Sequence, residues 1–259
     1  MPESDADLLS VAAEEAAKIA LRYWRSDQTI RDKGNGAGPV SEGDLAVDTY
    51  LRKTLTAARP DYGWLSEETP DNPERLSAKR VFIVDPIDGT RAYIDGQTTW
   101  AHSLAVVENG RTIAAVVHLP KLDKTYRAEL GGGALLNGKP LAASRRAALD
   151  GAEVLASRPV MDAAHWPGGV PNIERHFRPS LAYRLCLVAE GRFDAMITLR
   201  PTWDWDIAAG VLIAAESGAL ATDAAGAALR FNSQGAQSPG CIVASSAMHK
   251  AFLDHLGHG

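Results

Sequence analysis

The residues best suited to chemistry follow an apolar segment in the first half of the chain. Residues 81–84 have the β-branched and aromatic composition of a buried strand, and they run directly into Asp85-Pro86-Ile87-Asp88-Gly89-Thr90. Pro86 fixes one backbone torsion between the two acids, and Gly89 permits a conformation that other residues avoid. We therefore expect a rigid turn that holds the two carboxylates at one fixed separation, which suits a hard divalent cation.

Magnesium prefers oxygen ligands in near-octahedral geometry and leaves room for the phosphate of a substrate. Asp85, Asp88 and the carbonyl group of Ile87 fit that preference. The alternative is an Asx-type turn, in which the acids only accept hydrogen bonds from nearby amide groups. Acidic residues elsewhere in the chain must decide between these two interpretations.

Three other acids stand at comparable positions. Asp44 lies in the first turn of a helix expected over 41–58, Glu67 follows a short apolar strand at 62–65, and Asp206 begins a helix expected over 206–217. Each one alone is explained as a helix cap or as a partner of the helix dipole. Together with the pair at 85 and 88, they occupy strand ends and helix starts, where sites gather in α/β proteins. Carboxylates gathered without cations repel one another and take up protons, so the sequence predicts two or three bound metal ions.

Composition excludes several classes of function. The chain has 259 residues and a formal net charge of -5, so it has no excess of cations with which to coat a nucleic-acid polymer. Cys186 and Cys241 lie in apolar segments and are expected to be buried free thiols of a reducing compartment. There is no basic, apolar leader and no apolar segment of the ~20 residues that span a bilayer. We therefore expect a cytoplasmic protein that binds neither membranes nor nucleic-acid polymers.

The order of elements predicts two kinds of sheet. Helical spacing covers 5–25, 41–58, 181–190, 206–217 and 246–256, and strand patterns cover 62–65, 81–84, 103–107, 112–118, 124–130, 153–157, 193–199, 219–222 and 241–244. Residues 1–148 are expected to form an α+β subdomain with an antiparallel sheet and most of the metal ligands. Residues 149–259 are expected to form an α/β subdomain that supplies the last ligand and the substrate selectivity. The glycine-rich stretch 34–38 lacks the spacing of a nucleotide-binding loop and is expected to be a flexible connector.

Three segments resemble the signatures of the inositol monophosphatase superfamily of magnesium-dependent, lithium-sensitive phosphatases. They are Glu67-Glu68 after a strand, Asp85-Pro86-Ile87-Asp88-Gly89-Thr90, and Trp205-Asp206-Ile207-Ala208-Ala209-Gly210. Their order and spacing agree over nearly the whole chain, including Lys33 and Asp44 upstream. The resemblance implies an α+β fold, a layered αβαβα sandwich of the inositol monophosphatase and fructose-1,6-bisphosphatase type. It also implies a magnesium-dependent hydrolase of phosphate monoesters that acts on a small phosphorylated metabolite.

The resemblance further implies a role for each matching residue. The implied metal ligands are Glu67, Asp85 and the Ile87 carbonyl for one magnesium ion, and Asp85, Asp88 and Asp206 for a second. Glu67 would help to hold a third, weaker ion, and Mn²⁺ is expected to be able to substitute. The implied catalytic residues are Asp44, Glu67 and Thr90, of which Thr90 and Asp44 orient the attacking water. The implied substrate-binding residues are Asp88, Gly89, Thr90, Asp206, Ser180 and Arg184.

A second phosphatase family has a related motif. Haloacid-dehalogenase enzymes also place a strand before Asp, one spacer residue and Asp-Gly-Thr. Two residues separate Asp85 from Asp88 here, and the motif lies deep in the chain behind two helices. Both features disfavour that family.

The substrate is expected to be a nucleotide. Residues 65–68 and 180–191 look more like the bacterial 3′(2′),5′-bisphosphate nucleotidases, which convert adenosine 3′,5′-bisphosphate to AMP and phosphate. One departure is Arg178-Pro179-Ser180, where the family usually has Gly-Ser, so the backbone contact of that glycine is in doubt. Inositol-1-monophosphatase and histidinol-phosphatase are the alternatives within the superfamily, and a non-enzymatic regulatory binding partner is the alternative from another class. A homodimer is compatible with the sequence.

Candidates for binding a second phosphate are Arg178, Arg184 and Arg200, although arginines usually lie at the solvated surface. Trp203 and Trp205 have two interpretations, stacking on a base or packing in the core. Core packing is the favoured one.

Overall fold

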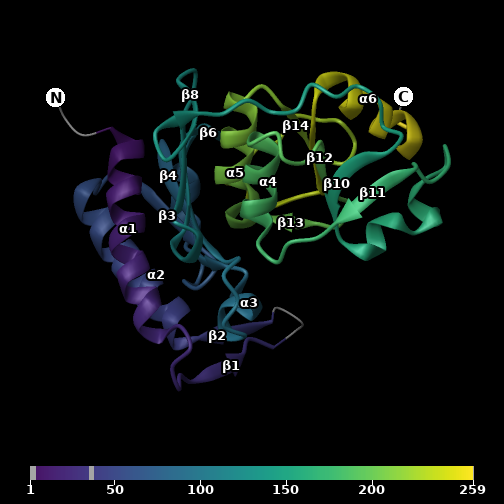
Figure 1. Ribbon diagram of the computed structural model, residues 1–259. Helices are drawn as coiled ribbons and strands as arrows, with labels where there is room; N and C mark the ends of the chain where they lie inside the picture. Colours follow the sequence, from purple (N-terminus) through teal and green to yellow (C-terminus); the bar gives the residue numbers. More distant parts are fainter. Residues whose placement is uncertain (1–3, 35–37, 259) are drawn as a thin grey trace.

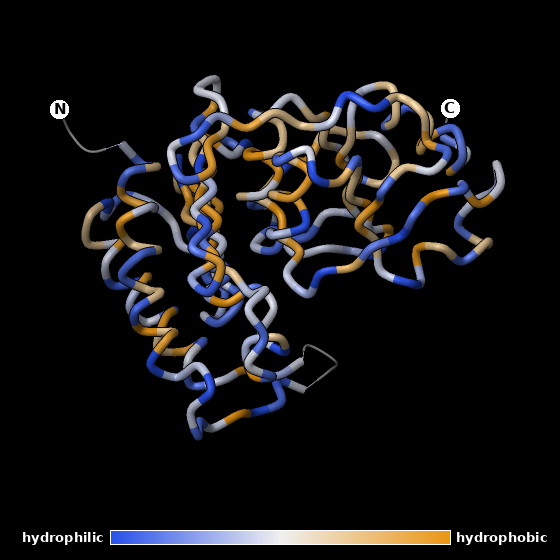
Figure 2. Tube along the Cα trace, in the orientation of Figure 1, coloured by the Kyte–Doolittle hydropathy of each residue, from blue (hydrophilic) through white to orange (hydrophobic). Residues whose placement is uncertain are grey.

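Helices and sheets alternate in five layers in the computed structural model, which describes residues 4–34 and 38–258 (Figure 1). The layers are α1 (Asp5–Tyr23) with α2 (Glu42–Ala58), a seven-stranded sheet, α4 (Leu181–Ala189) with α5 (Asp204–Glu216), a five-stranded sheet, and α6 (Ser246–Leu256). This is the expected α+β fold with an αβαβα sandwich. Apolar residues fill the strands and alternate with polar ones along α1 and α2 (Figure 2).

The first sheet has the order β3-β4-β5-β6-β7-β8-β9. Its strands are β3 (Gly63–Ser66), β4 (Arg80–Asp88), β5 (Ala101–Glu108), β6 (Arg111–Leu119), β7 (Lys124–Glu129), β8 (Gly133–Leu136) and β9 (Lys139–Pro140). From β4 to β9 all neighbours are antiparallel, as predicted, and Asn109 and Gly110 join β5 to β6 with positive φ angles. β3 instead pairs parallel with β4, because the connection between them, which contains a 3-10 helix (Pro73–Ser77), returns to the same end of the sheet.

The second sheet has the order β11-β10-β12-β16-β14. Its strands are β11 (Ile173–His176), β10 (Ala152–Ala156), β12 (Ala195–Thr198), β16 (Cys241–Ala244) and β14 (Leu220–Thr222). β10 is parallel to β11 and β12, whereas β16 is antiparallel to β12 and β14. The sequence did not predict β11, because this edge strand is mostly polar and shows no apolar alternation.

Short elements complete the end of the molecule at which the acids lie. β1 (Ile30–Asp32) pairs with β2 (Pro39–Ser41) beside α3 (Thr90–Ile94), and β13 (Thr202–Trp203) pairs with β15 (Gln237–Ser238) (Figure 1). The expected connector at 34–38 falls partly on residues 35–37, which lie outside the described residues.

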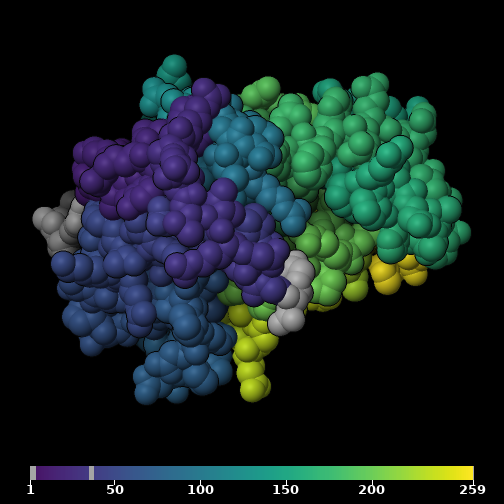
Figure 3. Space-filling model, turned by 90° about the horizontal axis from the view of Figure 1, so that it is seen from below, coloured from purple at the N-terminus to yellow at the C-terminus, as the bar shows by residue number. Residues whose placement is uncertain are grey.

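Three apolar cores hold the layers together. The first joins α1 and α2 to one face of the first sheet, the second surrounds α4 and α5 between the sheets, and the third lies between the second sheet and α6. Cys186 and Cys241 are buried as free thiols, as predicted. The expected division between residues 148 and 149 lies between β9 and β10, and it stays a prediction. Figure 3 shows the N-terminal part, in purple to blue, and the C-terminal part, in green to yellow, on opposite sides of the molecule.

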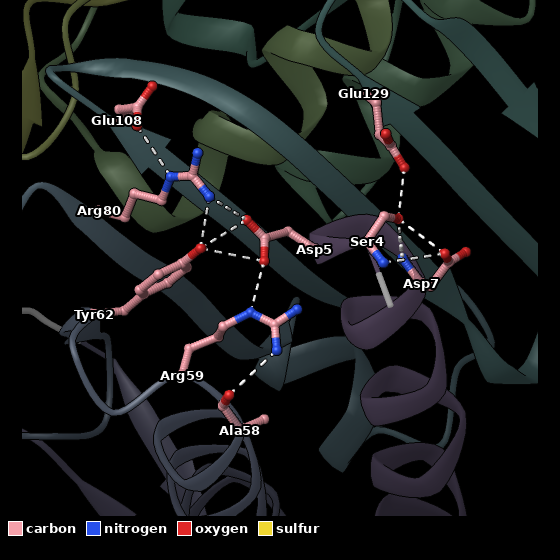
Figure 4. Close-up of polar contacts among 9 residues, drawn as sticks. All are labelled: Ser4, Asp5, Asp7, Ala58, Arg59, Tyr62, Arg80, Glu108 and Glu129. Carbon is pink, nitrogen blue, oxygen red and sulfur yellow. Dashed lines mark hydrogen bonds and ion pairs between the residues drawn. The ribbon is translucent and has the colours of Figure 1, made fainter. Parts of the chain in front are cut away.

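A polar network fixes the start of α1 (Figure 4). Ser4 and Asp7 form a capping box, in which each side chain accepts a hydrogen bond from the other residue's backbone N–H. The carboxylate of Asp5 accepts hydrogen bonds from Arg59 Nε at 3.1 Å, from the Tyr62 hydroxyl at 3.0 Å and from an Arg80 nitrogen at 3.3 Å. This acid is therefore matched by cations and donors.

No helix in the described ranges has both the length and the apolar composition needed to cross a bilayer.

Candidate metal centre

Strand β4 carries the first two acids in a bulge at its end. It continues through Asp88 instead of ending at Val84, so the expected turn behind the strand is wrong. Asp85 pairs with Ser103 of β5 and Asp88 pairs with Ala101, which leaves one extra residue in β4. Proline cannot donate to a sheet ladder and is tolerated at bulges, which explains why the irregularity lies at Pro86.

Asp85 and Asp88 meet Asp206 at this bulge. Asp206 lies in the first turn of α5, which packs against β4 and β5. One oxygen from each of the three carboxylates lies within 4.8 Å of the others. None of the three takes part in an ion pair among residues 4–34 and 38–258. The sequence prediction that these distant acids converge is therefore correct for the geometry of these three.

The environment favours the neutral form of these carboxyl groups when no cation is present. Burial, followed by repulsion from neighbouring acids, raises the pKa of Asp85 and that of Asp206 well above the usual range. Burial also raises the pKa of Asp88 to about 6, although hydrogen bonds from the start of α4 oppose the shift. A bound divalent cation would remove this repulsion.

Hydrogen bonds hold one oxygen of each β4 carboxylate. Oδ2 of Asp88 accepts from the Ser180 hydroxyl and from the Ala182 backbone N–H, both at 2.6 Å. Oδ1 of Asp85 accepts from the Ile87 backbone N–H at 3.0 Å, which is the Asx-type contact that the alternative interpretation required. The Asx-type contact is therefore present, and it leaves the other oxygen of Asp85 available to a cation. The Arg178-Pro179-Ser180 departure leaves Asp88 well bound at the helix start.

The donor set fits a hard cation. The groups gathered at the bulge are carboxylate oxygens, and the nearby Ile87 carbonyl accepts a hydrogen bond from Thr90 at 3.2 Å. Oxygen donors without nitrogen or sulfur suit Mg²⁺ and Mn²⁺. Asp85, Asp88 and Asp206 are thus able to hold a divalent ion.

Glu67 lies beside this group but is already paired. Lys33 Nζ lies 2.6 Å from a carboxylate oxygen of Glu67 and 2.6 Å from one of Glu68. Glu67 follows β3, the parallel neighbour of β4, and its charge contributes to the raised pKa of Asp85. The predicted site residues do not include Lys33, although it pairs with Glu67 and Glu68 beside the carboxylates. Its position before the glycine-rich stretch, in family spacing, was the available signal.

Asp44 and Thr90 are in contact, as expected from their implied roles. Oδ2 of Asp44 accepts from the Ser41 hydroxyl at 2.6 Å within the capping box of α2, and Oδ1 accepts from the Thr90 hydroxyl at 3.2 Å. Burial raises the pKa of Asp44 to about 6. Gly89 precedes α3 with φ of 96°, which explains the need for glycine there. The acid therefore both caps α2 and binds Thr90.

Two arginines extend the site beyond the carboxylates. Arg184 is 8% exposed, so a solvated surface role is wrong for it. Its guanidinium donates to the Arg178 carbonyl at 2.5 Å and lies 4.3 Å from the centre of the Phe177 ring. Asp88 attracts this cation, while the exposed Arg200 attracts Asp206 and repels Arg184. Positive charge therefore adjoins the acids.

Trp203 presents an exposed ring beside Asp206. Its side chain is 42% exposed, and it stacks on Trp205 with ring centres 4.7 Å apart and an angle of 9° between the planes. Trp205 is the inner ring, partly buried against the core between the sheets. The expected core packing is therefore wrong for Trp203, because Trp205 already fills the place next to the core. The backbone of Trp203 also acts to lower the pKa of Asp206, against the larger effect of burial.

Comparisons with known proteins agree with this geometry. The model of the Inositol monophosphatase family matches residues 3–257. An inositol-1-monophosphatase of Rhizobium meliloti (strain 1021) is 38% identical over 226 residues, which cover 83% of this chain and 84% of the relative. The 3′(2′),5′-bisphosphate nucleotidase CysQ of Aggregatibacter actinomycetemcomitans is 29% identical over 229 residues, 84% and 83% of the two chains.

The fold comparison gives the same result. A solved structure of an IMPase from Thermotoga maritima superposes with a TM-score of 0.83 at 27% identity, and the match covers 97% of this chain and 96% of that one. Family, fold and the gathered carboxylates therefore agree. The chain belongs to the inositol monophosphatase family and is a phosphoric monoester hydrolase.

Proposed function

We propose that this enzyme is a Mg²⁺-dependent 3′(2′),5′-bisphosphate nucleotidase that converts adenosine 3′,5′-bisphosphate to AMP and phosphate. The observation that carries the metal dependence is the group formed by Asp85, Asp88 and Asp206, which are close together and have no ion-pair partner among the described residues. Glu67 and the Ile87 carbonyl would complete the set of ligands for two to three ions. The two buried thiols suit the cytoplasm as its location.

The residues of the chain have distinct tasks in this proposal. Bound Mg²⁺ supplies Lewis-acid polarisation and a lowered pKa for water. The Thr90 hydroxyl lies 3.2 Å from both Asp44 Oδ1 and the Ile87 carbonyl, and its single proton can point to only one of them. When the proton points to Asp44, the lone pairs of Thr90 are free to accept a hydrogen bond from the attacking water. A proton that leaves the water passes to Thr90 Oγ1 as the Thr90 proton passes to Asp44. The backbone N–H groups of Gly89 and Thr90 would bind the phosphate oxygens.

The nucleotide assignment rests on the surroundings of Asp206 and Asp88. Arg184 and Arg200 place positive charge near these acids, where a second phosphate of the substrate needs a partner. The exposed face of Trp203 offers a platform for a purine ring, and a stacked base contributes about 1–3 kcal/mol. Inositol 1-phosphate has neither a second phosphate nor a planar ring. Histidinol phosphate has a ring but no second phosphate.

A substrate comparison tests the assignment. Phosphate release with MgCl₂ would be measured for adenosine 3′,5′-bisphosphate, inositol 1-phosphate, histidinol phosphate and fructose 1,6-bisphosphate. We expect the highest kcat/KM for the nucleotide, and loss of all activity with EDTA. A preference for inositol 1-phosphate would contradict the nucleotide assignment but not the metal centre.

A single variant tests whether the Trp203 ring binds the base of the nucleotide. Trp203→Leu should raise KM for adenosine 3′,5′-bisphosphate while leaving that for inositol 1-phosphate unchanged, because only the nucleotide can stack on the ring. Trp166→Leu is a matched control, since that indole packs on Phe252 under α6, in a different core from the carboxylates. An unchanged KM for the nucleotide in Trp203→Leu would contradict stacking on this ring, whereas a purely regulatory binding partner would release no phosphate from any substrate.

A further inference from the structure

The bulge in β4 is closed by a histidine from the neighbouring strand. Because the pairing passes from Asp85 and Ser103 to Asp88 and Ala101, Pro86 and Ile87 lie opposite His102. Nδ1 of His102 lies 2.5 Å from the carbonyl oxygen of Pro86. The three segments that resemble the family signatures do not include this histidine.

The contact shows which ring nitrogen must carry a proton. A carbonyl oxygen can only accept a hydrogen bond, so Nδ1 of His102 must carry the proton. Burial lowers the pKa of His102 to about 3, so the ring is neutral. Nε2 is then an acceptor, and it has no hydrogen-bond partner among the described residues. The ring is fully buried between Trp100, at 5.6 Å between ring centres, and His118, at 6.2 Å. His102 is therefore a neutral, tightly packed residue whose Nδ1–H group points at the Pro86 carbonyl.

The peptide unit between Pro86 and Ile87 is held at both ends. Its carbonyl accepts from His102, and its N–H donates to Oδ1 of Asp85 at 3.0 Å. A peptide unit is planar, so it can rotate only as a whole. Rotation of this unit would break both hydrogen bonds and would turn the Asp85 carboxylate and the following Ile87 carbonyl away from their present directions.

We propose that His102 is a positioning residue for the metal centre, which it orients through the peptide unit between Pro86 and Ile87. The proposal rests on the proposed function only in assuming that Asp85, Ile87 and Asp88 bind the metal. Removing the donor would leave the Pro86 carbonyl buried without this partner and would release the rotation of the Asp85 side chain. Groups that hydrogen-bond a metal ligand directly typically change metal affinity roughly 10- to 100-fold. His102 bonds the peptide unit that bonds Asp85, so the lower end of that range applies to it.

The chain allows a matched pair of variants at this position. In His102→Asn, the side-chain nitrogen occupies the same branch of the side chain as Nδ1 and can still donate to Pro86. His102→Leu has nearly the same shape as asparagine but has no donor. His249→Leu is the control, because His249 is also buried and bonded, to Thr222 at 2.7 Å, and it lies at the α6 side of the second sheet.

The full-length protein would be titrated with MnCl₂, with free Mn²⁺ followed by electron paramagnetic resonance, and each variant would be melted without metal. We expect His102→Leu to weaken Mn²⁺ binding by about 10-fold. His102→Asn should bind within about threefold of wild type, and His249→Leu should lose thermal stability without any change in Mn²⁺ affinity. Such a split cannot come from a general loss of stability.

Two results would overturn the proposal: wild-type Mn²⁺ affinity in the leucine variant, or equally weak binding in the asparagine and leucine variants. If the leucine variant does not fold, His102→Val, which suits a strand and also lacks a donor, replaces it in the comparison. Failure of wild type itself to bind Mn²⁺ would instead contradict the proposed metal centre. Mn²⁺ binding without phosphate release from any substrate would contradict the proposed activity alone.

Discussion

Two groups of acids in this protein have opposite surroundings. At the start of α1, Asp5 is met by Arg59, Tyr62 and Arg80, so its negative charge is balanced within the chain (Figure 4). At the end of β4, three carboxylates come within 4.8 Å of one another and have no ion pair in the described part of the chain. In the first group, the carboxylate of Asp5 links the start of α1 to Arg59, Tyr62 and Arg80. The second leaves a charge that something outside the chain must balance.

The pKa values show the same contrast. Hydrogen bonds from Ser4 and Arg127 lower the pKa of Asp7 in the first group. In the second group, burial and neighbouring acids raise the pKa of Asp85 and that of Asp206. The same residue type therefore has two settings: Asp7, bonded to a donor and a cation, has a lowered pKa, and the buried acids beside other acids have raised ones.

Removing one acid from the second group should have the largest effect. We expect Asp206→Asn to lower kcat/KM by about 100-fold or more, because even indirect partners of a metal are worth roughly 10- to 100-fold. The metal-free variant should melt at the same temperature as wild type or higher, since repulsion between carboxylates is reduced. Phosphate-release kinetics and thermal melts in EDTA check both parts. A variant that keeps its activity but loses stability would reverse the assignment of the two groups.

Metal should stabilise the fold in a pH-dependent way. In the folded, metal-free protein the pKa of Asp88 is raised to about 6. Between about pH 4 and 6 the folded protein therefore binds a proton at Asp88 that the unfolded chain has lost. The free energy of unfolding of the metal-free protein falls as the pH rises through this range. The contribution of Asp7 has the opposite sign: it is present above the unfolded pKa and is lost as the pH falls.

A fixed MgCl₂ concentration of about 100 times the Kd at pH 8 should raise the melting temperature by about 5–10 °C at pH 8. The rise should be smaller at pH 5, because protons then compete with Mg²⁺ for the carboxylates. Calorimetry at the two pH values measures this difference. Equal shifts at both values, or an equal shift in Asp206→Asn, would show that Mg²⁺ acts elsewhere.

Breaking the balanced group should cost stability and leave the chemistry intact. Asp5→Asn keeps an acceptor but loses its charge, so we expect the free energy of unfolding to fall by about 1.5 kcal/mol. Urea unfolding measures the loss, and kcat/KM should stay within twofold of wild type. A large loss of activity in this folded variant would mean that the N-terminal network controls the site.

Lys33 offers an intermediate case, since its cation balances Glu67 and Glu68 next to the unpaired acids. Lys33→Met should lower stability by about 1 kcal/mol in EDTA, because the ion pairs are only partly buried. Added Mg²⁺ should recover part of that loss, since a bound cation can balance Glu67 instead. If Mg²⁺ stabilised the variant less than wild type, Lys33 would have to be counted with the metal-binding groups rather than with the balancing ones.

The sequence predicted which elements carry the acids better than it predicted the local structure and contacts around them. Periodicity located the strands and helices that carry Asp44, Glu67 and Asp206, because apolar burial sets those patterns. It ended β4 too early, since proline and two acids look like a turn when the partner strand is unknown. It also missed His102 and left open whether Arg184 is buried, because the setting of a polar residue depends on tertiary contacts.

The order in which the acids occur along the chain has a consequence for biosynthesis. Asp85 and Asp88 leave the ribosome more than a hundred residues before Asp206, which arrives with α5 and depends on the packing of that helix between the two sheets. The three carboxylates therefore cannot come together until α5 has been synthesised and has packed between the two sheets. Binding of a metal ion by all three must follow that step.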